Sequence, residues 1–180
     1  MMIFLIILSC LIWLAAFLLL PKRILIAPGL SYCALVILSF AKKNGFPIMP
    51  LSNGMLLSWL VITFVVMMIV LLQNPAVRQQ SRGVGYMTIG GIAGMAVGLL
   101  GFTFSTNLNL LYALMIAGSI AGIFFGFLLF TNTPDGRDVA LPTGRFFKYL
   151  LAKGFPILVT VAQFGIPAII LIAGSLLSPI

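Results

Sequence analysis

The sequence predicts an all-α polytopic membrane protein with about six transmembrane helices. Of its 180 residues, 62% are hydrophobic and 7% are charged, whereas a soluble domain is about 45–50% apolar and about 25% charged. Its mean hydropathy is +1.26, and charged residues separate long uncharged stretches. This composition excludes a soluble globular enzyme, a disordered tail, a nucleic-acid-binding module and a disulfide scaffold.

The spans are defined by apolar stretches between charged or polar residues. A helix that crosses the hydrocarbon core needs about 20 apolar residues. The uncharged stretch between Arg82 and Asp135 is long enough for two helices, with a polar break at 105–107. We therefore expect one transmembrane domain, 1–180, with spans at 2–20, 24–41, 55–73, 84–104, 108–131 and 155–178.

The first two spans each allow an alternative. A signal peptide begins with positive charges, but here Lys22 and Arg23 follow the apolar run, so we expect a retained first helix. The span at 24–41 is short and carries Pro28 near its start, where a helix tolerates proline. A re-entrant or interfacial segment there would reduce the count to five.

The basic residues predict the orientation. Loops after the first, third and fifth spans share one side of the membrane, and loops after the second and fourth share the other. The first side carries eight basic residues and the second carries two, Lys42 and Lys43. Because basic loops stay in the cytosol, we expect both termini outside. The eight are Lys22, Arg23, Arg78, Arg82, Arg137, Arg145, Lys148 and Lys153.

Small residues recur at four-residue spacing in the fourth and fifth spans. Helices in lipid associate through close packing of such residues. The pattern predicts a tight hairpin between these spans or a contact between copies of the chain, and a glycine-lined translocation path is the functional alternative. The helix-packing residues are Gly90, Gly94, Gly98, Gly118, Gly122 and Gly126.

Four polar residues inside the spans are candidates for binding a substrate: Gln163, Thr160, Tyr112 and Ser119. Gln163 lies four residues before Pro167, whose ring leaves the backbone carbonyl of Gln163 without its helical donor. The side chain of Gln163 therefore satisfies that carbonyl, bridges two helices, or lines a polar cavity with Thr160. No charged residue lies within a predicted span, which argues against proton coupling through the chain's own side chains.

The segment 143–153 predicts a short amphipathic helix on the cytosolic surface of the membrane. On a helical wheel Phe146, Phe147, Leu150 and Leu151 share one side, and Arg145, Lys148, Tyr149 and Lys153 share the other. Such a helix lies among headgroups, with its cations near anionic phosphates. We expect Arg145, Lys148 and Lys153 to contact anionic lipid headgroups or a protein partner.

Nothing in the sequence indicates catalysis, a metal or a cofactor. Asp135 and Asp138 are the only carboxylates, Arg137 lies between them, and the chain has no histidine. The two cysteines, Cys10 and Cys33, lie in separate apolar runs, so they form no metal or redox motif. We expect no enzymatic activity, no cofactor, no metal and no nucleic-acid partner.

Two functions remain. The first is a small membrane transport protein, or the membrane subunit of a transporter, for an uncharged or lipid-like solute. The second is a non-catalytic accessory or scaffold subunit of a larger membrane complex. The repeat of Gly45-Phe46-Pro47-Ile48 at 154–157 suggests two related halves, as in several transporters, and so favours the first. We expect a homo-oligomer or other membrane subunits, in a bacterial inner membrane.

Overall fold

The computed structural model describes residues 2–43, 46–49, 51–73, 82–101, 107–138 and 143–177. Its described elements are almost all helical, apart from a two-residue antiparallel ladder that pairs Lys42 with Pro47 and Lys43 with Phe46. This confirms the predicted all-helical fold. The elements are α1 (Met2–Leu19), α2 (Ala27–Ser39), β1 (Lys42–Lys43), β2 (Phe46–Pro47), α3 (Asn53–Leu71), α5 (Val84–Leu100), α6 (Leu108–Thr131), α7 (Pro134–Asp138) and α8 (Thr143–Leu177).

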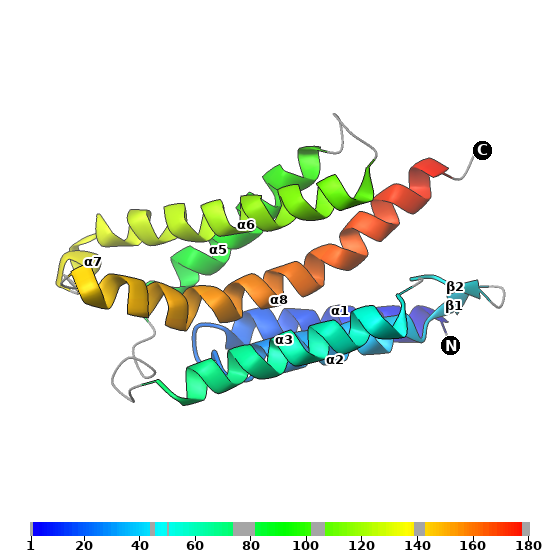
Figure 1. The fold of residues 1–180 in the computed structure, drawn as a ribbon, viewed down its shortest axis with the longest axis horizontal. Helices are drawn as coiled ribbons and strands as arrows, with labels where there is room; N and C mark the ends of the chain where they lie inside the picture. Colours follow the sequence, from blue (N-terminus) through cyan, green and yellow to red (C-terminus); the bar gives the residue numbers. More distant parts are fainter. Residues whose placement is uncertain are drawn as a thin grey trace.

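Helix α8 lies between two groups of helices, with α5 and α6 on one side and α1, α2 and α3 on the other (Figure 1). It contacts all five of these helices and contributes to both apolar clusters of the core. The start of α1 and the end of α8 lie at the end of the bundle that carries β1 and β2, and α7 lies at the opposite end (Figure 1). Helix α8 is therefore the central helix of the bundle, and it connects the two groups of helices.

Four described helical segments are long and apolar enough to cross a membrane: α1, α3, α6 and Tyr149–Ile170 of α8. Helices α2 and α5 are apolar but shorter, with 13 and 17 residues. The predicted span at 24–41 is thus shortened to α2, because the chain forms turns from Leu20 to Ile26. As expected, Pro28 lies in the first turn of α2.

Helix α8 differs from the prediction of a surface helix followed by a separate span. Its 35 residues run without a break through Gly154 and Pro156. Proline removes one backbone donor, but packed neighbours allow it inside membrane helices. The hydroxyl of Thr160 donates to the carbonyl oxygen of Pro156 at 2.8 Å. The expected helix at 143–153 is therefore the first part of α8, and residue 178 lies outside the described residues.

Glycines bring the backbones of α5 and α6 together. A Cβ atom on Gly94 would overlap the carbonyl oxygen of Gly118 and lie 3.0 Å from the Cα of Gly122. Equivalent overlaps with the opposite backbone occur at each of the six predicted helix-packing glycines: Gly90, Gly94, Gly98, Gly118, Gly122 and Gly126. Larger residues on these faces would force the two helices apart.

The peripheral helices expose apolar side chains. Only 17% of the candidate span is buried in α1 and in α3, against 72% in α8. In a membrane, exposed hydrophobic residues face lipid and require no protein partner. The exposed surface of the outer helices is thus the one expected of membrane-spanning segments. Examples are Ile3, Phe4, Ile7, Leu11, Leu14 and Leu18 on α1 and Leu57, Val61, Phe64 and Val65 on α3.

Candidate functional site

A buried polar pair joins α8 to α3. Gln163 is fully buried, and its Nε2 donates to the hydroxyl oxygen of Thr63 at 2.7 Å. That hydroxyl in turn donates to the carbonyl oxygen of Trp59, also at 2.7 Å. In this arrangement the hydroxyl of Thr63 donates to Trp59 and accepts from Gln163, so the amide nitrogen of Gln163 faces Thr63.

This orientation leaves the amide oxygen of Gln163 unsatisfied. Its Oε1 is buried and accepts no hydrogen bond from any part of the chain that the structure describes. A buried acceptor without a donor costs about 1–3 kcal/mol, and water is scarce inside a bilayer. The oxygen thus retains the capacity to accept a hydrogen bond from a hydroxyl or N–H group.

The pair lies close to the middle of its helices. Thr63 is one residue past the centre of α3 (Asn53–Leu71), and Gln163 lies three to four residues past the centre of Tyr149–Ile170. At a rise of 1.5 Å per residue, that offset is about 5 Å. Solute sites of membrane transporters lie near the bilayer midplane.

Thr160 belongs to a second polar connection. Its hydroxyl bonds the Pro156 carbonyl of its own helix, and its carbonyl oxygen accepts from the hydroxyl of Ser31 at 3.3 Å. Ser31 accepts in turn from Nε1 of Trp13 at 3.0 Å. Thr160 therefore ties α8 to α2 and α1, and its hydroxyl is already used.

The other two predicted substrate residues are placed differently. Ser119 is buried, and its hydroxyl donates to the carbonyl oxygen of Met115 one turn earlier in α6, at 2.8 Å. Tyr112 is half-buried and packs against both apolar clusters, as Trp59 and Phe164 do. The structure therefore places Tyr112 where the two groups of helices meet, whereas Ser119 bonds within its own helix.

Lys153 has an environment different from the one that the sequence predicts. It lies within the candidate span Tyr149–Ile170, whereas the predicted span began at residue 155. It is also only 2% exposed, as is Tyr149, whereas Leu151 is 49% exposed. The part of the polar side that carries Tyr149 and Lys153 therefore faces the protein, whereas Leu151 of the apolar side is exposed.

Tyr149 fixes this part of α8 to the start of α5. Its hydroxyl donates to the carbonyl oxygen of Arg82, and its ring packs against Phe127 of α6 with centroids 5.7 Å apart. Lys153 lies one turn further along α8, and its side chain is also buried. The side chains of Arg145 and Lys148, predicted to contact headgroups, lie outside the described residues.

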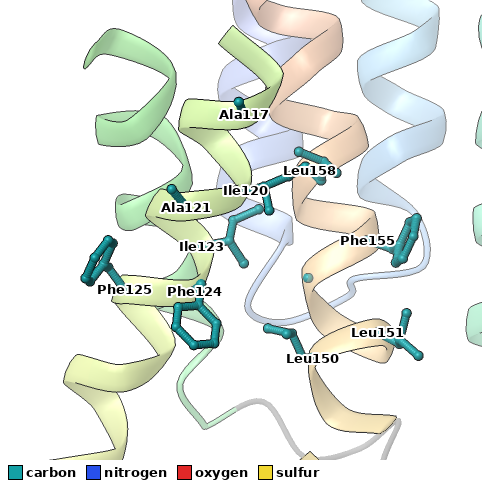
Figure 2. Close-up of a pocket in the computed structure, with 11 residues that line it drawn as sticks. Ala117, Ile120, Ala121, Ile123, Phe124, Phe125, Leu150, Leu151, Phe155 and Leu158 are labelled. Carbon is teal, nitrogen blue, oxygen red and sulfur yellow. The ribbon is translucent and has the colours of Figure 1, made fainter. Parts of the chain in front are cut away.

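Two apolar grooves flank Phe155 and Leu158 of α8. The larger has a volume of about 690 Å³ and lies between α6 and α8 (Figure 2). The smaller, about 310 Å³, is lined by residues of α3, α6 and α8, including Trp59 and Ala162. Its lining includes Trp59 and Ala162 but neither Thr63 nor Gln163, so the polar pair lies outside this groove.

Sequence reasoning identified Gln163 but missed Thr63, its partner. Gln163 stands out as the only amide in its span, yet Thr63 is one hydroxyl among several and lies 100 residues away in the chain. The one feature that could have identified Thr63 from the sequence is its position near the middle of the predicted span 55–73. No protein-family model, curated protein or solved structure matches this chain.

Proposed function

We propose that this protein is a small integral membrane transport protein, or the membrane subunit of a transporter, for an uncharged or lipid-like solute. The observation that carries the proposal is the unsatisfied Oε1 of Gln163, buried near the middle of two helices. A neutral acceptor among apolar side chains favours an uncharged molecule with one hydroxyl or amide donor.

The proposal includes six crossings with both termini outside. Helices α1, α2, α3, α5, α6 and α8 alternate in direction along the bundle (Figure 1). Helix α5 lies along α6 from Tyr86 to Gly98, so it would cross the membrane with α6. The α1–α2 connection and the start of α5 lie at the end that carries α7 (Figure 1). Lys22 and Arg23 of that connection, and Arg82 just before α5, are exposed. By the positive-inside rule that end would face the cytosol.

The test is native mass spectrometry of the protein extracted from its own membrane with a mild detergent. Wild type should retain a small uncharged molecule, and Gln163→Leu should not. The double variant Thr63→Val/Gln163→Leu removes both polar partners together, which leaves no unsatisfied group and preserves folding. Ser119→Ala is the matched control, because it removes a buried hydroxyl that bonds only its own helix.

An accessory or scaffold subunit is the second candidate. The observation that favours it is the apolar face of α1, where large side chains stay exposed along the helix, from Ile3 to Leu18. Such a face suits either lipid or another membrane subunit. Stoichiometric co-purification of other polypeptides, with no small molecule in wild type, would favour this candidate over transport.

A further inference from the structure

Helix α8 carries a glycine and a proline close together, at Gly154 and Pro156, and it curves along its length (Figure 1). Because proline has no backbone N–H, the carbonyl oxygen of Ala152 lacks its helical donor. The carbonyl oxygen of Pro156 accepts from the hydroxyl of Thr160 at 2.8 Å, a contact within one turn that often bends helices. Glycine also weakens a helix relative to alanine. These features favour a bend in α8 at 154–156.

The hydrogen bonds that tie α8 to its neighbours differ on the two sides of this segment. Before it, the hydroxyl of Tyr149 donates to the carbonyl oxygen of Arg82, at the start of α5. After it, the carbonyl oxygen of Thr160 accepts from a hydroxyl of α2, and the amide of Gln163 donates to a hydroxyl of α3. The first part of α8 is thus bonded to one group of helices and the later part to the other.

Helices α5 and α6 form one stiff unit, because their glycines bring the two backbones into direct contact. The later part of α8 meets this unit through apolar contacts. A Cβ atom on Gly91 would lie 3.5 Å from Ile157, and one on Gly165 would overlap the sulfur of Met115. Contacts between glycine and a flexible thioether adapt to small shifts, whereas a hydrogen bond requires a fixed geometry. These apolar surfaces therefore allow sliding.

Open space on both sides of Phe155 leaves room for a bend. The larger groove extends along α8 from Leu150 to Leu158, past Gly154 (Figure 2). The smaller groove lies on the α3 side of Phe155. A Cβ atom on Gly154 would lie 3.5 Å from Ile123 of α6, which is an ordinary contact. Because closely packed interiors resist deformation, the two grooves lower the cost of bending α8 here.

We propose that α8 bends at 154–156, so that α5, α6 and the first part of α8 move as one body against α1, α2, α3 and the later part of α8. The motion changes the separation of α3 and α6 across the smaller groove. From Ile123 to Leu110, α6 is about 20 Å long, so a change in bend of about 20°, the size of a sharp proline kink, moves Leu110 by about 7 Å. The inference goes beyond the proposed function, because it does not depend on any solute.

The experiment measures distances between spin labels by pulsed electron paramagnetic resonance, in the full chain reconstituted into lipid vesicles. The exposed Cys10 and Cys33 are first replaced by alanine. The starts of α3 and α6 lie at the end that carries β1 and β2 (Figure 1), and Leu57 and Leu110 near these starts are exposed. Labels on Leu57→Cys and Leu110→Cys should give distances spread over about 7 Å. Labels on Leu110→Cys and Val97→Cys, an exposed position of α5, lie within one body and should give one narrow distance.

Stiffening the segment should remove the spread. Gly154→Ala combined with Pro156→Ala gives Ala152 its backbone donor and replaces the glycine, so the α3–α6 distances should narrow to one. The added methyl group at residue 154 meets only ordinary contacts, so this variant retains the fold. Pro167→Ala is the matched control, because Pro167 is also inside α8 but follows Gly165, which Met115 already packs against. This control should leave the spread unchanged.

Three outcomes would overturn the proposal. The first is a single narrow α3–α6 distance when α8 is unchanged, and the second is an equal spread in the Gly154→Ala/Pro156→Ala variant. The third is a spread that Pro167→Ala alone removes, which would place the bend at the second proline. Because no solute is added, none of these results depends on whether Gln163 binds one.

Discussion

The indole Nε1 of Trp13 donates a hydrogen bond to the hydroxyl of Ser31 at 3.0 Å, deep inside the bundle. The hydroxyl of Ser31 in turn donates a hydrogen bond to the carbonyl oxygen of Thr160, so a single hydroxyl links α1, α2 and α8. The ring of Trp13 also packs edge-on against Phe164, with centroids 5.5 Å apart. These contacts fix the first two helices to the central helix.

Replacement of Ser31 by alanine should weaken this connection. It leaves the buried indole N–H of Trp13 without its acceptor, and hydrogen bonds between membrane helices contribute about 0.5–2 kcal/mol. We expect the Ser31→Ala variant to unfold more readily by that amount in a reversible detergent assay. Ser31→Ala combined with Trp13→Phe should cost less than the sum of the two single changes. Additive losses would mean that the two groups are not coupled.

The α5–α6 contact should be intolerant of even one added methyl group. A Cβ atom on Gly94 would overlap the carbonyl oxygen of Gly118, whereas nothing lies within 4 Å of a Cβ on Gly85 in the same helix. We expect Gly94→Ala to lower the free energy of unfolding by about 1–3 kcal/mol, the usual cost of overpacking. Gly85→Ala should be neutral or stabilising. Thermal unfolding of both variants in one detergent tests this, and equal midpoints would refute the close contact.

Local signals in the sequence predicted several helix ends well. Helix α6 spans the expected 108–131. Its start is set by Asn107, whose side chain caps the first turn by accepting from the backbone N–H of Asn109. Helix α3 begins two residues before the expected 55, because Ser52 accepts from the backbone N–H of Met55 and caps the helix earlier. Capping residues act within one turn, so their effect can be recognised without knowledge of the tertiary fold.

The environment of each side of α8 could not be predicted in the same way. Its first turns are amphipathic, but a helical wheel alone does not show which side contacts lipid and which side contacts protein. The sequence suggested water or headgroups for the side of Tyr149 and Lys153, but both side chains are buried, and Tyr149 packs against Phe127 of α6. The Gln163–Thr63 pair is equally non-local, because the two residues are 100 positions apart. Only the packing of α3 against α8 brings them together.

The polar pair predicts a specific pattern of stability. Thr63→Val removes the acceptor of a buried amide and should lower stability by about 1–3 kcal/mol, whereas Thr63→Ser retains the hydroxyl. Gln163→Leu in the Thr63→Val background should recover most of the loss, because no polar group then remains unpaired. A double-mutant cycle measured by unfolding in detergent tests this. If Thr63→Val alone is neutral, the amide of Gln163 has another partner.

Labelling from the two sides of the membrane tests whether α2 crosses, the step on which six spans depend. Lys22 and Lys42 flank this 13-residue helix, and both are exposed. The native Cys10 and Cys33 are also exposed, so both are first replaced by alanine. We expect an impermeant thiol reagent to label Lys42→Cys in intact cells, and Lys22→Cys only in inverted vesicles, because basic loops remain in the cytosol.

Arg82→Cys is the control for the cytosolic side and should behave as Lys22→Cys does. If Lys22→Cys and Lys42→Cys are labelled from the same side, α2 is re-entrant, the span count is five, and the two ends of the chain lie on opposite sides of the membrane.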